Sequence, residues 1–475
     1  MCVRSRFRRS LRVVVLVLFS TATVLTGGLC CSSSAEVPQP SIPEGVGPLP
    51  DFSNGAKSGV FVTREHVDMY RALLPRELVE LIGRNEFVCE VARNPQRPEL
   101  FERVAKNEAA PPTLTAEGSL SPVPQKITGA IFPAISEATD EAGQKRRAYE
   151  VLWNVHSSLW ALRSSAHKLM LTIFKEPESK GHTVNFLAER VYPQSFGVKP
   201  GKLEPLFREK ISATAPRVIS PLKWLTLRFV GGVEDYVWVS SPITAKVRQL
   251  TGSNRSDLLF VGAFTPDDLF VWSGKVEHVE PSSLSLMPML VPVLETPMGT
   301  AGVKSESCSA IDFGGSPLVL NAHPQRFRNG PAWIPTNVRF VVRSVWKIEL
   351  VAKDPFSLDA RQTLYVDALT YQPIYRSVWE SDGRSRRFVM GVLGSTIGSG
   401  VYRPTWAGEI LFSTIDGGRS VLVPIAVETC DAFVAGRMLD DFDPSKLAPA
   451  APIETVSPQV QLNAAMPTEV HESGE

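Results

Sequence analysis

The feature that most constrains this chain is a repeated alternation of apolar and polar residues after residue 154. Successive side chains of a strand point to opposite faces of a sheet, so a period of two predicts strands. The strand-forming stretches are 167–174, 223–230, 236–239, 337–352, 361–368, 372–380 and 386–394. Turn-forming residues follow two of them, at 242–245 and 381–383. Many strands joined by short turns, without alternating helices, predict an antiparallel sheet.

Helices are expected mainly before these strands. Thr63 is placed to begin a helix that ends at Gly83 and is interrupted by Pro75. Its apolar positions recur at spacings of three or four: Val67, Tyr70, Leu74, Leu78 and Ile82. A second helix is expected from Asp140 to about Asn154. A sheet of many strands curls to protect its edges and cover its apolar face. The predicted fold is therefore α+β and β-dominated: a strongly curved antiparallel sheet, or half-barrel, with helices covering its concave face.

The two ends of the chain differ from its centre. Residues 1–35 combine five arginines, no acid and a short apolar run, which is typical of an export signal. Residues 36–54 form a proline-rich tether, and residues 448–475 are predicted to be a disordered tail. The 475 residues are 43% hydrophobic and 21% charged, so the remaining 55–447 are expected to form one globular domain. Long loops are expected within it at 107–126 and 292–335.

Two processing routes remain open for the leader. Ser33 and Ala35 suit cleavage by an ordinary signal peptidase, whereas Cys30 offers a lipidation site whose preceding residues fit a lipobox poorly. Without residues 1–35 the formal net charge moves from +1 to −4, so no nucleic-acid partner is expected. Cys89, Cys308 and Cys430 then remain. They form either one disulfide with an odd thiol or three unpaired, mostly buried cysteines.

No catalytic constellation stands out, and neither a metal site nor a cofactor is expected. The seven histidines make no metal-binding pair, and no nucleophile elbow or phosphate-binding loop occurs. Asp267 and Asp268 are adjacent, and on a strand they would point to opposite faces. Thr265 and Pro266 before them are typical of a helix start, where acids complement the helix dipole. The pair is therefore predicted to be structural, with Arg248 or Arg255 as its ion-pair partner.

Residues 235–269 carry a run of motifs that resembles the hallmark of the bacterial outer-membrane lipoprotein-sorting-like superfamily. The matching positions are Trp238, Pro242, Lys246-Val247-Arg248, Arg255-Ser256-Asp257, Gly262, Phe264-Thr265 and Asp268-Leu269. Gln249, Ala263 and Pro266-Asp267 depart from the usual pattern. Further likeness to the large uncharacterised branch of this superfamily lies at 60–75, 129–154, 343–384 and 442–447. The resemblance therefore spans roughly residues 55–447.

The resemblance implies a fold similar to the LolA/LolB-like carrier and receptor of lipoproteins, and an activity without chemistry. Lipid or lipoprotein acyl chains would bind in an apolar concavity, in the periplasm or at the periplasmic face of the outer membrane. The candidate lining residues are Leu225, Leu227, Phe229, Leu152 and Trp153. Arg255 and Asp257 are expected to hold the crossing from the sheet to a covering helix. The alternative is an accessory protein that docks on an inner-membrane lipid-exporting transporter or an outer-membrane protein.

Overall fold

A computed structural model describes most of the segment between residues 60 and 447. The described ranges are 60–92, 112–124, 129–132, 135–160, 163–175, 181–193, 204–220, 222–241, 246–258, 264–300, 302–305, 308–321, 331–398, 401–415, 417–430 and 439–447. The expected leader, Cys30, the tether and the tail all lie outside them. No helix among these residues is both long and apolar enough to cross a membrane.

Strands dominate the described residues, as the alternation predicted. Their bounds are β1 Val60–Val62, β2 Cys89–Val91, β3 Thr113–Leu114, β4 Leu120–Ser121, β5 Ser164–Phe174, β6 His182–Val191, β7 Phe207–Ala215, β8 Lys223–Arg228, β9 Tyr236–Ser241, β10 Lys246–Leu250, β11 Val279–Leu294, β12 Gly302–Ser305, β13 Cys308–Asp312, β14 Val338–Ala352, β15 Arg361–Asp367, β16 Pro373–Trp379, β17 Ser385–Gly398, β18 Val401–Ser413 and β19 Arg419–Cys430. All except the β3–β4 hairpin belong to one sheet. Each of the seven stretches with period two lies largely in a strand.

The sheet is strongly curved, and its pairing is mixed. From β14 to β10 the neighbours run β14–β15–β16–β17–β18–β19–β5–β6–β7–β8–β9–β10, every pair antiparallel. β11 pairs antiparallel with β14 and, through Val293 and Leu393, parallel with β17. The strands β11, β14, β15, β16 and β17 therefore form a closed circuit of pairing. β14 also pairs parallel with β2. The fold class is confirmed, but an all-antiparallel sheet was wrong because of these two parallel contacts.

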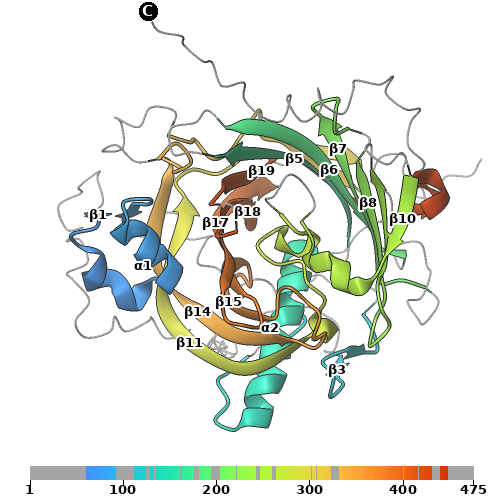
Figure 1. The fold of residues 1–475 in the computed structure, drawn as a ribbon, viewed down its shortest axis with the longest axis horizontal. Coiled ribbons are helices and arrows are strands. Elements are labelled where there is room, and N and C mark those ends of the chain that lie inside the picture. The colour runs from blue at the N-terminus through green and yellow to red at the C-terminus, as the bar shows by residue number, and fades with distance from the viewer. Residues whose placement is uncertain are drawn as a thin grey trace, which may run out of the picture. The chain divides into compact units, whose positions relative to one another are not determined.

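Helices are few, and two of the expected ones occur. The first is split at Pro75 into the 3-10 helix η1 (Val67–Leu73) and the helix α1 (Arg76–Gly83). The second, α2, runs from Glu141 to Trp160, longer than expected. One end of α2 lies within the curve of the sheet, and the helix passes across β11 (Figure 1). Short 3-10 turns complete the set: η4 Gly252–Ser256, η5 Pro266–Asp268, η6 Val276–His278, η8 Leu439–Phe442 and η9 Pro444–Leu447.

The two expected long loops contain strands. The described part of 107–126 holds the β3–β4 hairpin, and 292–335 holds the end of β11 together with β12 and β13. Proline and glycine hid these strands: Pro288 and Pro292 lie within or near the end of β11, and Gly302 begins β12. β13 pairs with β19, where Cys308 lies opposite Cys430 and forms a disulfide with it. Cys89 is a buried free thiol, so the first cysteine alternative holds.

Buried apolar side chains form three cores against the sheet. One packs η1 and α1 against β11, β14 and the strands up to β19. A second contains side chains of α2, of β5 to β8 and of residues 264–278. A third and smaller core joins Val191 and Leu225 to Phe442 and Leu447 of the C-terminal 3-10 turns. The expected concavity therefore corresponds to the second core, which α2 fills together with an irregular segment.

Candidate functional site

Residues 264–278, here called the inner segment, occupy the second core without forming a regular helix or strand. Apart from the single turns η5 and η6 the backbone is irregular, yet all but Asp267 and His278 are buried. Its apolar side chains in that core are Phe264, Leu269, Phe270, Val271, Trp272 and Val276. The helix expected after Thr265-Pro266-Asp267-Asp268 is therefore only one turn, with Thr265 as N-cap and Pro266 in its first position as predicted.

The centre of the inner segment is strained. Phe270 and Val271 have φ angles of 60° and 68°. A positive φ is a genuine outlier for a β-branched residue such as valine. The backbone N–H of Val271 donates to the Glu409 carboxyl at 2.6 Å. Burial raises the pKa of Glu409 well above its usual range, which favours the neutral form of this side chain. Glu409 thus supports the strained turn as a buried acceptor.

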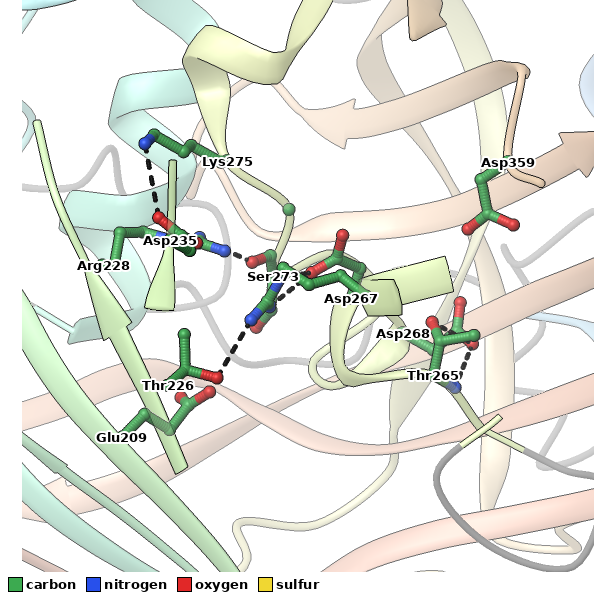
Figure 2. A network of polar contacts seen from close by, with 12 residues as sticks. Glu209, Thr226, Arg228, Asp235, Thr265, Asp267, Asp268, Ser273, Lys275 and Asp359 are labelled. Atoms are coloured by element: carbon green, nitrogen blue, oxygen red, sulfur yellow. Dashed lines mark hydrogen bonds and ion pairs between the residues drawn. The ribbon is translucent and has the colours of Figure 1, made fainter. Parts of the chain in front are cut away.

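Two arginines of the sheet hold the carboxylate of Asp268. Arg376 Nη1 and Arg387 Nε lie 2.6 and 2.8 Å from Asp268 Oδ1. Asp359 pairs with the same two arginines, and all four side chains are almost fully buried. The Thr265 N–H and hydroxyl donate to the other oxygen of Asp268 at 2.8 and 2.9 Å (Figure 2). Burial opposes ionisation of Asp268, but the arginines outweigh it and lower its pKa.

A second group of ion pairs links the inner segment to β8, to η4 and to Asp235, which precedes β9. Arg228 and Lys275 contact the two oxygens of Asp235 at 2.9 and 3.3 Å (Figure 2). Burial opposes ionisation of Asp235, but these cations outweigh it and hold its pKa at about 2. Arg255 donates from Nε to Asp267 at 2.7 Å and from Nη1 to Thr226 at 3.2 Å.

The adjacent aspartates are thus held by different arginines, Asp267 by Arg255 and Asp268 by Arg376 and Arg387. Arg255 was one of the two expected partners. The other, Arg248, is exposed on β10 and pairs with neither. Asp257 accepts from Asn254 at 2.6 Å, and among the described residues its side chain has no hydrogen bond or ion pair to the inner segment, unlike that of Arg255. Of the two residues predicted to hold the crossing from the sheet, only Arg255 binds the inner segment.

The expected apolar lining residues do not share one cavity. Leu152 and Trp153 are buried in the second core. Leu225 and Leu227 instead face the third core beneath η8 and η9, and Phe229 is buried with its ring 5.1 Å from that of Tyr236. The opposite face of β8 points inward. Trp224 joins the second core, Thr226 binds Arg255 and Arg228 binds Asp235. The prediction chose the more apolar face of β8, and the inward face is the one with charges.

The other motif residues are placed by packing. Trp238 is half-buried against the third core, and Phe264 is buried in the second. Sequence reasoning missed the charged residues that meet in and around the inner segment: Arg228, Asp235, Lys275, Asp359, Arg376, Arg387 and Glu409. One signal was available. Four charged residues interrupt strands that are otherwise largely apolar: Arg228, Arg376, Arg387 and Glu409. A strand with two apolar faces is not expected to place a charge in solvent, so such a charge indicates a buried position.

A cavity of about 700 Å³ opens beside the inner segment, which forms one of its walls. Its other walls come from residues 232–236, 249–256 and 352–362. The residues that line it are mainly polar: Gly232, Glu234, Asp235, Tyr236, Gln249, Leu250, Thr251, Arg255, Ser256, Asp267, Trp272, Gly274, Lys275, Glu277, His278, Val279, Ala352, Lys353, Asp354, Ser357, Asp359 and Gln362. Its volume is in the range of small-molecule sites.

A second, much smaller space lies in the apolar interior. A crevice between Trp153, Phe207 and their apolar neighbours encloses about 10 Å³, which is near the volume needed for one water molecule. The inner segment and α2 fill what would otherwise be the concavity.

No protein-family model matches the chain, and no curated protein matches it. Among solved structures, an outer membrane lipoprotein-sorting protein domain from Vibrio parahaemolyticus is similar, with 12% identity and a TM-score of 0.41 over 63% of this chain and 97% of that one. A DUF1329 family protein from Desulfovibrio piger is 13% identical with a TM-score of 0.41, covering 64% and 99% of the two chains. A LolA superfamily protein from Nitrosomonas europaea is 13% identical with a TM-score of 0.37, covering 62% and 97%.

Proposed function

We propose that this protein binds a long-chain amphiphile of the bacterial envelope without chemically changing it, and that the acyl chain enters by displacing part of the inner segment. The observation that supports this most is the nature of the material inside the curved sheet. An irregular segment with two positive φ angles has a higher conformational free energy inside the sheet than a helix or a strand would have. A strained occupant lowers the free energy that a competing ligand must supply.

The magnitudes allow such an exchange. Four apolar side chains, Leu269 to Trp272, would lose roughly 6–12 kcal/mol if they left the core, at about 1.5–3 kcal/mol each. An acyl chain of roughly 15 methylenes would gain on the order of 12 kcal/mol on entering it. The two terms are comparable, so a long chain is able to compete and a short chain is not. We therefore expect a threshold of chain length.

The proposed location is the periplasm or the periplasmic face of the outer membrane. The arginine-rich leader predicts export. The Cys308–Cys430 disulfide agrees with that route, because disulfides persist in oxidising compartments and are rare in the cytosol. A carrier in this compartment would shield acyl chains from water between two membranes.

Hydrogen exchange with and without ligand tests both parts of the proposal. Native mass spectrometry should detect one bound palmitate on the purified mature protein and no bound octanoate. Palmitate should increase amide exchange in residues 264–278 while leaving residues 67–83, under the other core, unchanged. If palmitate does not bind, the proposed function is wrong. If it binds while exchange in 264–278 stays the same, the displacement of the inner segment is wrong.

A further inference from the structure

The polar cavity lies where the head of a bound amphiphile would be placed. Asp267, Trp272 and Gly274 line it, and they belong to the same inner segment whose apolar side chains fill the core. A chain that replaced Phe270 and its neighbours would therefore carry its head toward this cavity. The chemistry of the walls then indicates the class of head group.

The charges deepest in the cavity walls are already neutralised. Asp235 is paired with Arg228 and Lys275, and Asp267 with Arg255. Asp359 is paired with arginines of β16 and β17 behind it. A charged ligand would lose its hydration without meeting a free opposite charge among these groups.

The remaining polar groups are mostly neutral or lie at the rim. Burial first, and then Lys275, lower the pKa of His278 to about 4, so its imidazole is neutral near pH 7. Glu234 is largely exposed, and Lys353 donates to the backbone carbonyl of Glu117 at 3.1 Å. The hydroxyls of Thr251, Ser256 and Ser357 also line the cavity. Glu277 is a further carboxyl of the wall: burial raises its pKa, and it accepts from the Gly231 N–H at 3.0 Å. Such a wall is rich in donors and acceptors, and its acids outside the ion pairs are Glu234, Glu277 and Asp354.

One buried donor faces an open space. Trp272 is 1% exposed, and its indole Nε1–H donates to no acceptor among the residues that the structure describes. Beside it lies Gly274, where a Cβ atom would come within 2.6 Å of Nε1. The glycine therefore keeps the indole edge clear at the cavity wall. A ligand oxygen placed at this edge would accept a hydrogen bond from the indole.

Resting on the proposed function, we propose that this cavity binds a saccharide, the head of a glycolipid whose acyl chain replaces part of the inner segment. Sugar hydroxyls match a wall of neutral donors and acceptors, and the Trp272 N–H supplies one fixed donor to a sugar oxygen. The volume of about 700 Å³ accommodates a small saccharide.

Four soluble probes separate the head group from the chain. Dodecyl maltoside, dodecylphosphocholine and dodecyl sulfate share one chain, and maltose has none. Titration calorimetry below the micellar concentration should give dodecyl maltoside an affinity at least about tenfold higher than the two charged amphiphiles, because two or more added hydrogen bonds are worth that factor. Free maltose should bind more weakly but measurably.

Two glycine variants provide a matched pair for the indole donor. Gly274→Ala places a methyl group against Trp272 Nε1, whereas a Cβ at Gly83, the last residue of α1 and outside the cavity wall, meets nothing within 4 Å. We expect Gly274→Ala to weaken dodecyl maltoside binding roughly five- to tenfold and to leave dodecyl sulfate unchanged. Gly83→Ala should alter neither. Trp272→Phe, which keeps a ring and removes the donor, should reproduce the loss if Gly274→Ala folds poorly.

The outcomes distinguish the two proposals. Equal binding of the three amphiphiles, or the same small effect of both glycine variants, would overturn the saccharide site and leave the acyl-binding function standing. If maltose binds and none of the three amphiphiles binds, the saccharide site is supported and the acyl-binding function is overturned. Failure of every probe to bind would overturn both.

Discussion

The two structures that cover the sheet, the η1–α1 pair and the inner segment, bury apolar side chains by opposite means. In the N-terminal pair the helices are regular, and the core that they share with the sheet is made of apolar residues such as Leu78 and Ile82. Neither helix has a side-chain cap. The inner segment has two positive φ angles, several buried ion pairs and a capping box at Thr265 and Asp268.

The difference follows from the hydrogen bonds of the backbone. A helix satisfies its own N–H and C=O groups, whereas a buried irregular segment must find partners elsewhere. Here the partners are side chains. Arg228 donates to the carbonyl of Ser273 at 2.9 Å, Arg376 to that of Asp267 at 3.0 Å, and Glu409 accepts from Val271. The buried charges are thus the means by which an irregular segment is kept inside a sheet.

Removing a partner of the buried arginines should have the largest effect. Asp268→Ala leaves Arg376 and Arg387 with Asp359 as their remaining carboxylate and removes the cap on Thr265. Loss of one partner from a buried ion pair costs about 3–5 kcal/mol. We expect a loss of that size in the free energy of unfolding, measured by urea denaturation. Arg71→Ala, which breaks an exposed pair on η1, should change little. A small effect of Asp268→Ala would mean that the network does not stabilise the inner segment.

Truncation on the regular side should cost a similar or slightly smaller amount but spare binding. Leu78 is fully buried in α1, so Leu78→Ala is expected to lower the free energy of unfolding by about 2–5 kcal/mol. Its core is separate from that of the inner segment. Palmitate affinity, measured by native mass spectrometry at a temperature where both proteins are folded, should therefore stay unchanged. A parallel loss of palmitate affinity would show that binding also depends on the core beneath η1 and α1.

The buried acid beneath Val271 should make stability depend on pH. Burial raises the pKa of Glu409 above the 4.5 of a free glutamate, so the folded state binds more protons than the unfolded state. Stability therefore falls as the pH rises from about 4.5 toward the folded-state pKa, by up to about 1.4 kcal/mol per pH unit. Glu409→Gln keeps a neutral acceptor for the Val271 N–H and should lose this slope. Melting temperatures of both proteins between pH 5 and 8 should thus diverge in favour of the variant, and parallel curves would rule out a protonated Glu409.

Much of the fold was predictable because strands with period two carry their own signal. The stretches that became β5, β8, β9 and β14 to β17 were recognised, and so was the split of the first helices at Pro75. β11 and β12 were missed because proline and glycine in the sequence weaken a strand pattern. The curvature followed from the number of strands and the scarcity of helices.

The site was harder to predict because its residues meet only in three dimensions. Thr265 and Asp268 are three residues apart, and their cap was readable from the sequence. Arg376 and Arg387 lie more than 100 residues beyond Asp268, and no local rule links them to it. The choice of inward face on β8 failed for a related reason. Apolar character alone favoured Leu225 and Leu227, but the third core under η8 and η9 also needed an apolar face.

The smallest effect is expected at the cap that begins the inner segment. Thr265 is fully buried, and its hydroxyl donates to Asp268 at 2.9 Å. Thr265→Ala removes this bond and should lower the free energy of unfolding by about 1–2 kcal/mol, as for other N-caps. Thr265→Ser keeps the hydroxyl and should recover most of that loss. Thr63→Ala, at the start of the N-terminal helices, should cost less than Thr265→Ala because Thr63 is not the N-cap of η1. Equal losses at Thr63 and Thr265 would show that capping does not distinguish the two covers, and that the inner segment is held by its ion pairs and by Glu409 instead.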